Sequence, residues 1–100
     1  MKDIAELTKQ LGNTDSSMRR SAAELLGLTE DETVIDALIP VLRDENRFVR
    51  QEVVLALKKI GGSRAVENLT QALSTEKNEL VRDFIRRVLE RLQSKESGSS

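Results

Sequence analysis

The sequence predicts an all-α fold, an αα-superhelix or solenoid of about three helical hairpins and therefore six helices. Two observations predict it: apolar residues recur at helical spacing, and the whole pattern repeats at an interval of 31 or 32 residues. Composition agrees, since Trp and Tyr are absent and there are only two Phe. The alternation typical of strands is missing, so we expect helices joined by short loops.

The first set of helices, called here the B helices, is predicted at residues 3–11, 34–42 and 65–73. These segments align at an offset of 31 without a gap. Their aligned apolar positions are Ile4/Ile35/Val66, Leu7/Leu38/Leu69 and Leu11/Leu42/Leu73. Spacings of three and four place such residues on one helix face. Pro40 should weaken or bend the last turn of the second B helix.

The second set, called the A helices, is predicted at residues 18–28, 49–60 and 81–92. The first step is 31 and the second is 32, because one residue is inserted in the segment EKNEL. Their aligned apolar positions are Met18/Val49/Val81, Ala22/Val53/Ile85 and Leu26/Leu57/Leu89. The chain therefore reads B-A-B-A-B-A.

Residues that start and stop helices stand between these segments. A residue of a favoured N-cap type precedes every A helix: Asp15, Asn46 and Asn78. Thr29 and Glu32 have the spacing of a capping box before the second B helix. Gly61 and Gly62 predict a helix stop, and Ser63 is a candidate cap of the third B helix.

Length and composition indicate a single domain at residues 1–93, followed by a polar tail at 94–100 that we expect to be disordered. Lys and Arg nearly balance Asp and Glu, and the net charge is −1, unlike the basic excess of many nucleic-acid binders. No apolar run is long enough to span a bilayer or to act as a signal peptide. We expect a cytoplasmic protein.

Chemistry is restricted by the residues that the chain lacks. Without Cys or His, disulfides, thiol catalysis, histidine triads and zinc sites built from these residues are excluded. Carboxylates such as Asp36 and Glu67 have no unusual setting, and Gly61-Gly62 is a turn rather than a phosphate loop. We therefore expect no enzyme activity and no cofactor or metal.

The segment LRDENRFVRQEVVLALKKIGGSRAVENLTQAL, residues 42–73, resembles the HEAT-like repeat, of the kind also found in phycobilin lyases. The resemblance covers about residues 3–92. It implies that the B helices line a concave surface and that Asp/Arg pairing between repeats is structural. It says little about the ligand, because the repeat is a scaffold with many functions.

Three matched arginines, Arg19, Arg50 and Arg82, each follow the first buried residue of an A helix. One interpretation is a basic ladder that grips phosphate or carboxylate ligands. The interpretation that we favour is structural: each guanidinium bonds carboxylates or helix-end carbonyls of the adjacent repeat, with Asp44 as the obvious partner. Recurrence in every repeat favours a stacking contact over a binding site.

Candidate partner-binding residues are the B-helix positions that the core does not need. They are Lys9, Asp36, Ala37, Pro40, Arg64, Glu67, Asn68 and Gln71. They form a mixed surface with a more apolar second helix, a pattern suited to a partner helix or peptide. The alternative is that they are ordinary solvated helix faces.

Other functions remain open at the two ends of the chain. Arginines of the last A helix, including Arg86 and Arg87, suggest a polar cap on the solenoid. Nucleic-acid binding by this helix is disfavoured, because acidic residues lie among the arginines and no aromatic side chain is available for stacking. The first B helix has no A helix before it and could support self-association. The resemblance also allows an accessory role in bilin attachment or removal.

Overall fold

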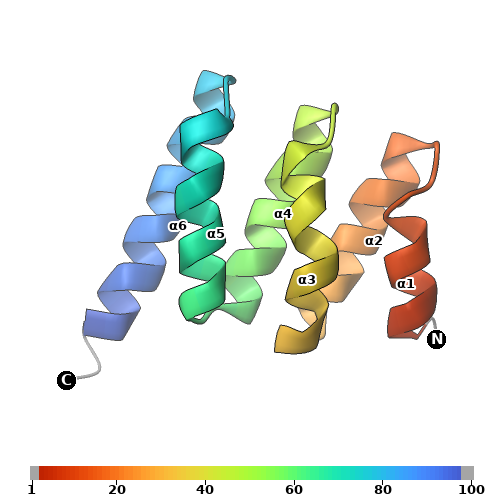
Figure 1. The fold of residues 1–100 in the computed structure, drawn as a ribbon, viewed down its shortest axis with the longest axis horizontal. Coiled ribbons are helices and arrows are strands. Elements are labelled where there is room, and N and C mark those ends of the chain that lie inside the picture. Colours follow the sequence, from red (N-terminus) through yellow and green to blue (C-terminus); the bar gives the residue numbers. More distant parts are fainter. Residues whose placement is uncertain (1–2, 98–100) are drawn as a thin grey trace.

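The computed structural model describes residues 3–97, with side chains described as far as residue 94. Three helical hairpins lie side by side along the longest axis, with the N-terminal hairpin at one end and the C-terminal hairpin at the other (Figure 1). The α-helices are α1 (Ile4–Gln10), α2 (Ser16–Leu28), α3 (Ile35–Leu38), α4 (Arg47–Ile60), α5 (Ser63–Thr75) and α6 (Glu79–Ser97). The 3-10 helices η1 (Glu32–Val34) and η2 (Ile39–Arg43) flank α3. The predicted all-α repeat architecture is confirmed.

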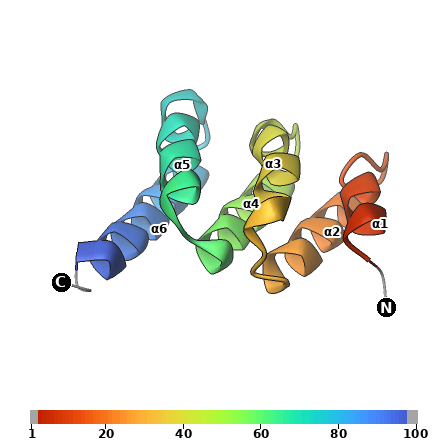
Figure 2. The same cartoon turned by 60° about the horizontal axis from the view of Figure 1, so that its bottom comes forward.

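The helices form two rows. The B helices α1, α3 and α5 make one row, and the A helices α2, α4 and α6 make the other (Figures 1 and 2). The stack measures 40 × 29 × 15 Å, so it is long and thin. Each hairpin can bury apolar surface only against its partner helix and its neighbouring hairpins, as expected of a solenoid.

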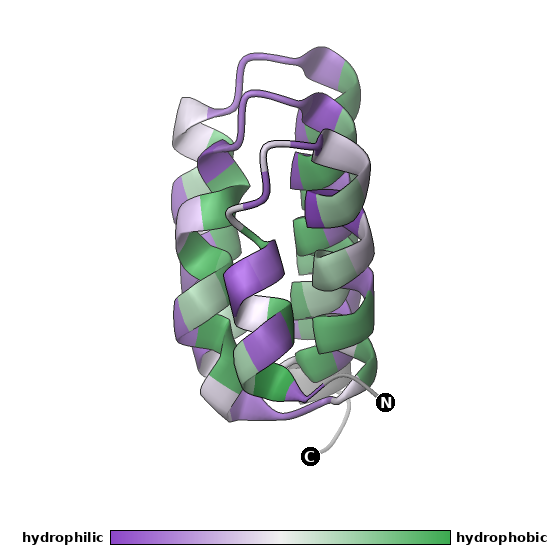
Figure 3. Ribbon diagram, turned by 90° about the vertical axis from the view of Figure 1, so that its right-hand side faces the viewer, coloured by the Kyte–Doolittle hydropathy of each residue, from purple (hydrophilic) through white to green (hydrophobic). Residues whose placement is uncertain are grey.

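The core lies between the two rows and continues across the boundaries between hairpins. Leu26 and Leu57 of the A row and Leu38 and Leu69 of the B row are fully buried, as the aligned spacing predicts. Viewed from the N-terminal end, both rows show hydrophobic residues interspersed with hydrophilic ones along each helix (Figure 3). One contiguous cluster of buried residues joins all three hairpins.

The N-caps predicted for the A helices are confirmed. The side chain of Asp15 accepts a hydrogen bond from the Ser17 N–H at 2.9 Å. Asn46 and Asn78 cap α4 and α6 in the same way, each accepting from the backbone N–H groups two and three positions on. The Gly61-Gly62 stop is also confirmed, since both residues have positive φ, a conformation that costs glycine little.

Two other capping predictions are wrong. Thr29 does not form a box with Glu32; its hydroxyl donates to the carbonyl of Leu26 at 2.6 Å at the end of α2. Asp31 caps η1 instead, accepting from the Thr33 N–H. Ser63 is the first residue of α5 rather than its cap. Gly62, with φ of 90°, occupies the cap position and provides no side-chain hydrogen bond to the first turn.

The second B helix is more irregular than predicted. Only Ile35–Leu38 is α-helical, and 3-10 turns replace the rest of the expected helix at 34–42. Pro40 is near the start of η2. It has no N–H to donate to the carbonyl of Asp36, and its ring crowds the preceding turn. The proline therefore disrupts the helix around it rather than only its end.

The last helix is longer than predicted. Helix α6 continues to Ser97, into the segment 94–100 for which the sequence predicts disorder. No glycine or proline occurs between Glu79 and Ser97, so nothing in the local sequence stops the helix earlier. Residues 98–100 of the expected tail lie outside the described residues. Among the described helices, none has both the length and the apolar character needed to cross a membrane.

Candidate functional site

Two of the three matched arginines, Arg19 and Arg50, lie at boundaries between hairpins. Arg82 of the last hairpin bonds carbonyls of its own hairpin instead, so the inter-repeat contact predicted for it is not formed among the described residues. Arg19 of α2 is buried and reaches the second hairpin, where its Nε lies 2.7 Å from Oδ2 of Asp44 and its Nη2 lies 3.0 Å from Oδ1. Its Nη1 donates to the backbone carbonyls of Asn13 and Thr14. The structure thus brings Arg19 and Asp44 together as a two-point ion pair, the strongest common geometry for this contact.

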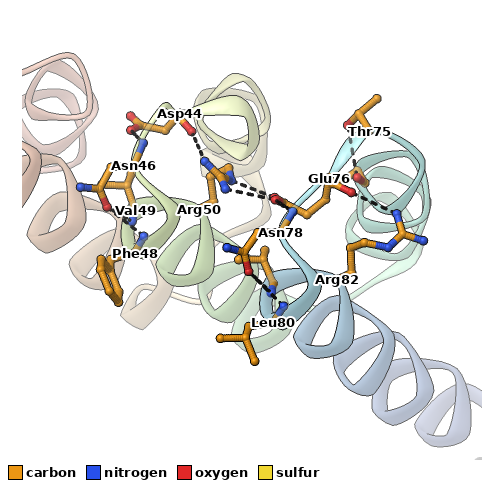
Figure 4. A network of polar contacts seen from close by, with 12 residues as sticks. Asp44, Asn46, Phe48, Val49, Arg50, Thr75, Glu76, Asn78, Leu80 and Arg82 are labelled. Atoms are coloured by element: carbon orange, nitrogen blue, oxygen red, sulfur yellow. Dashed lines mark hydrogen bonds and ion pairs between the residues drawn. The ribbon is translucent and has the colours of Figure 1, made fainter.

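Arg50 repeats this arrangement one hairpin further along (Figure 4). Its Nε lies 2.8 Å from Oε1 of Glu76 and its Nη2 lies 3.1 Å from Oε2. Its Nη1 donates to the carbonyl of Asp44 at 2.8 Å. Asp44 therefore contributes to both boundaries. Its side chain pairs with Arg19, and its backbone carbonyl accepts a hydrogen bond from Arg50.

Glu76 is a partner that sequence reasoning missed. A signal for it exists, because Asn13, Asp44 and Glu76 each stand six positions before a matched arginine. At each of these three positions the side-chain oxygen also accepts from the backbone N–H two residues on, at 2.8 to 3.0 Å. The extra residue of the third repeat lies between the third B helix and Glu76 rather than within EKNEL. At the B-helix offset of 31, Asp44 therefore aligns with Thr75, which conceals the match to Glu76.

Burial and hydrogen bonding shift the pKa values of both members of the Arg19–Asp44 pair. Burial raises the pKa of Asp44. The hydrogen bonds from the Arg19 guanidinium and the Asn46 N–H act in the opposite direction, and the net result is a pKa below the ordinary aspartate value. The hydrogen bond to Asp44 raises the pKa of Arg19. Both groups stay charged at neutral pH, and the pair is a permanent ionic link between hairpins.

A shallow groove lies between the second and third B helices. A hollow of about 50 Å³ is lined by Ile39, Leu42, Arg43, Asn68, Gln71, Ala72 and Thr75. A wider, open hollow of about 410 Å³ shares Leu42, Arg43 and Thr75 with it and extends toward the loops that hold the arginine pairs. Of the predicted contact residues, the structure places Asn68 and Gln71 on this groove.

Two further candidates pair with each other. Asp36 of α3 and Arg64 of α5 form an exposed ion pair between neighbouring B helices, and this pairing raises the pKa of Arg64. The side-chain amide of Asn68 donates to the carbonyl of Arg64 at 2.8 Å, so these residues are partly engaged within the protein.

The remaining candidates are spread over the B row. Glu67 and Pro40 are exposed, whereas Ala37 is half-buried and packs against the core. Lys9 is exposed on α1 and does not line the groove. Sequence reasoning missed Arg43 and Thr75, whose place on the groove depends on how η2 lies against α5. Within the described residues, no group of three or more carboxylates is arranged to hold a metal ion.

Comparison with known proteins identifies the repeat. The family model described as HEAT repeats matches residues 4–90, which cover both rows of helices and the arginine pairs. A search of curated proteins finds no significant match.

Proposed function

The chain belongs to the HEAT-repeat family, and from that premise we propose that it is a non-catalytic scaffold that binds a partner protein on its B-helix surface. HEAT repeats commonly serve as protein-interaction scaffolds. The observation that supports this site is the groove between η2 and α5, where apolar and polar side chains meet on the exposed row.

The groove suits a helix or peptide that is amphipathic. Ile39, Leu42 and Ala72 give it an apolar floor. The amides of Asn68 and Gln71 lie at its edge and can bond polar groups of an incoming chain. An apolar centre with a polar rim is the usual anatomy of a protein interface, and amphipathic helices commonly bind in such grooves.

The test is affinity capture from native extract with matched variants. Changing Asn68, Gln71 and Thr75 to lysine alters three residues that line the groove, and we expect this groove variant to lose a protein that the wild type captures. The control changes exposed neutral residues off the groove by the same charge: Thr8, Ser21 and Gln93 to lysine.

Control and wild type should capture the same protein, and purified partner should then bind wild type and control with equal affinity. If the two triple variants lose the same proteins, or if the groove variant loses none, the proposed site is wrong. Circular dichroism of each variant checks that the helices are retained.

A second hypothesis is an accessory role for a bilin-carrying protein. It is supported by the resemblance to the repeat of phycobilin lyases alone, so we rank it below the scaffold role.

A further inference from the structure

The arginine pairs follow one geometric rule. Nη1 of each arginine donates to backbone carbonyls at the end of its own B helix or in the loop after it, and the Nε/Nη2 edge of Arg19 and Arg50 faces the following hairpin. At both internal boundaries this edge holds a carboxylate, Asp44 for Arg19 and Glu76 for Arg50, with all four N–O distances between 2.7 and 3.1 Å.

Arg82 of α6 makes the backbone-carbonyl contacts of this arrangement but not the carboxylate contact. Its Nη1 donates to the carbonyl of Leu73 at 2.7 Å and to that of Glu76 at 3.0 Å (Figure 4). The guanidinium is therefore held in place as in the other two repeats. Among the side chains described, no carboxylate meets its Nε/Nη2 edge. Because the Nε/Nη2 edge of Arg82, called here the fork, is already held in place, binding of a carboxylate loses less side-chain entropy.

The residues around this edge are polar rather than apolar. Arg86, one turn along α6, occupies the position at which Ala23 and Val54 are fully buried against the next hairpin. It is exposed and takes part in no ion pair of the described residues. The neighbouring Arg87 is neutralised by Asp83 at 3.0 Å, and Glu79 and Glu90 are exposed acids one turn before Arg82 and one turn after Arg86.

A second copy of this chain does not supply the missing carboxylate by continuing the stack. Its first hairpin carries Asn13 at the position of Asp44 and Glu76, and a neutral amide offers no charge to the fork. The exposed Arg86 would also meet partly exposed apolar residues of that hairpin, such as Leu25. The occupant must therefore bring its own acidic groups.

We propose that the C-terminal end of the stack is a second docking surface, at which the Arg82 fork receives a carboxylate from an acidic segment of a partner protein and Arg86 interacts with a neighbouring acid. This surface is separate from the groove on the B row. Two-point recognition of a carboxylate by arginine is strong and directional, and two internal copies of the contact show that this repeat can form it.

The test observes the arginine side chains directly. A blocked oligoglutamate peptide is titrated into ¹⁵N-labelled full chain, and the Nε–H signals are followed by NMR. We expect the Arg82 signal to move and saturate, whereas those of Arg19 and Arg50, already paired, stay in place. A blocked oligoglutamine peptide is the neutral control and should move none of them.

Variants distinguish two-point recognition by the Arg82 fork from general attraction between opposite charges. Arg82→Lys keeps the charge but loses the fork, and we expect peptide affinity to fall about tenfold. Arg86→Gln changes an exposed side chain and should weaken binding several-fold without affecting the fold. Arg91→Gln is the matched control: nine positions from Arg82, it lies on the opposite side of α6 at about 100° per residue, and should leave affinity unchanged.

Several outcomes would overturn the proposal. One is an Arg82 signal that moves no more than those of the paired arginines. Another is an equal loss of affinity in Arg91→Gln, which would indicate diffuse attraction. Tighter binding of a single-stranded oligonucleotide of equal charge would identify a phosphate polymer instead, and concentration-dependent shifts without peptide would identify a second copy. Gln71→Ala in the groove leaves the net charge unchanged and should bind the peptide normally, so failure of one site is distinguishable from failure of the other.

Discussion

Arg19 shows how a charged residue can belong to the interior of this small stack. Its side chain is only 10% exposed, as is that of Asp44. Removing two charges from water is unfavourable, and attraction compensates only when the geometry is good and the other polar atoms are bonded. Both conditions are met, because the remaining N–H groups reach loop carbonyls and Asp44 also accepts from Asn46.

We predict that this pair is strongly coupled. Asp44→Asn should lower the free energy of unfolding by about 2 kcal/mol, since it removes charge-assisted hydrogen bonds from a largely buried group. In a double-mutant cycle with Arg19→Gln, measured by denaturant unfolding, the combined loss should be much smaller than the sum of the single losses.

The exposed pair Asp36–Arg64 provides the control for this cycle. Its side chains are 75% and 48% exposed, so water and salt screen it. Its cycle should show little coupling. Equal coupling in the two cycles would mean that burial does not set the strength of these pairs.

At the scale of the helix, close packing of α2 on α4 depends on Gly27. A Cβ at this position would lie 2.7 Å from the Cα of Ala56 and 2.8 Å from its Cβ. Such contacts are far inside van der Waals distance and involve backbone, which cannot move without shifting a whole helix. Glycine fits here because there is no room for a side chain, although glycine has a low helix propensity.

We predict that Gly27→Ala destabilises the protein by about 2 kcal/mol in thermal or denaturant unfolding. Overpacking should outweigh the propensity gain of roughly 1 kcal/mol. Gly12→Ala is the control, because its Cβ would meet only the carbonyl oxygen of Lys9 at an ordinary 3.6 Å. It should change stability by about 0.5 kcal/mol or less. A stabilising Gly27→Ala would show that the two helices separate easily.

At the scale of the whole molecule, the hairpins share one core but have unequal support. Leu57 in α4 lies in the middle hairpin, is fully buried and has neighbours on both sides. The seven-residue α1 contributes Leu7 as its buried side chain and packs at the end of the stack. In a nearest-neighbour stack, the centre should support all hairpins and the end should open first.

We predict that Leu57→Ala lowers stability by about 2–5 kcal/mol and reduces hydrogen-exchange protection in all three hairpins. Leu7→Ala should reduce protection mainly in α1, since no hairpin depends on that helix from both sides. Amide exchange measured by NMR on both variants checks this. Loss confined to α4 in Leu57→Ala would mean that the hairpins unfold independently.

Much of this architecture was predictable from the sequence. Helical periodicity follows from local backbone geometry, and so the aligned leucines, the A-helix caps and the six-helix order are readable from the residues alone. The repeat interval also identified Arg19, Arg50 and Arg82 as equivalent. The interruption at Pro40 was only partly predictable, because how far a proline disturbs a helix depends on the contacts of the turns on either side.

The sequence by itself determined which residues form helices, which face of each helix is buried and which positions repeat. Only the tertiary structure decided which groups meet across the hairpins: Glu76 with Arg50, Asp36 with Arg64, and Arg43 with Gln71 on one groove. Helical periodicity is a local property of neighbouring residues in the sequence, whereas these contacts join residues of separate hairpins. Their pairing depends on how far each hairpin shifts and turns against the next, which packing of the whole stack sets.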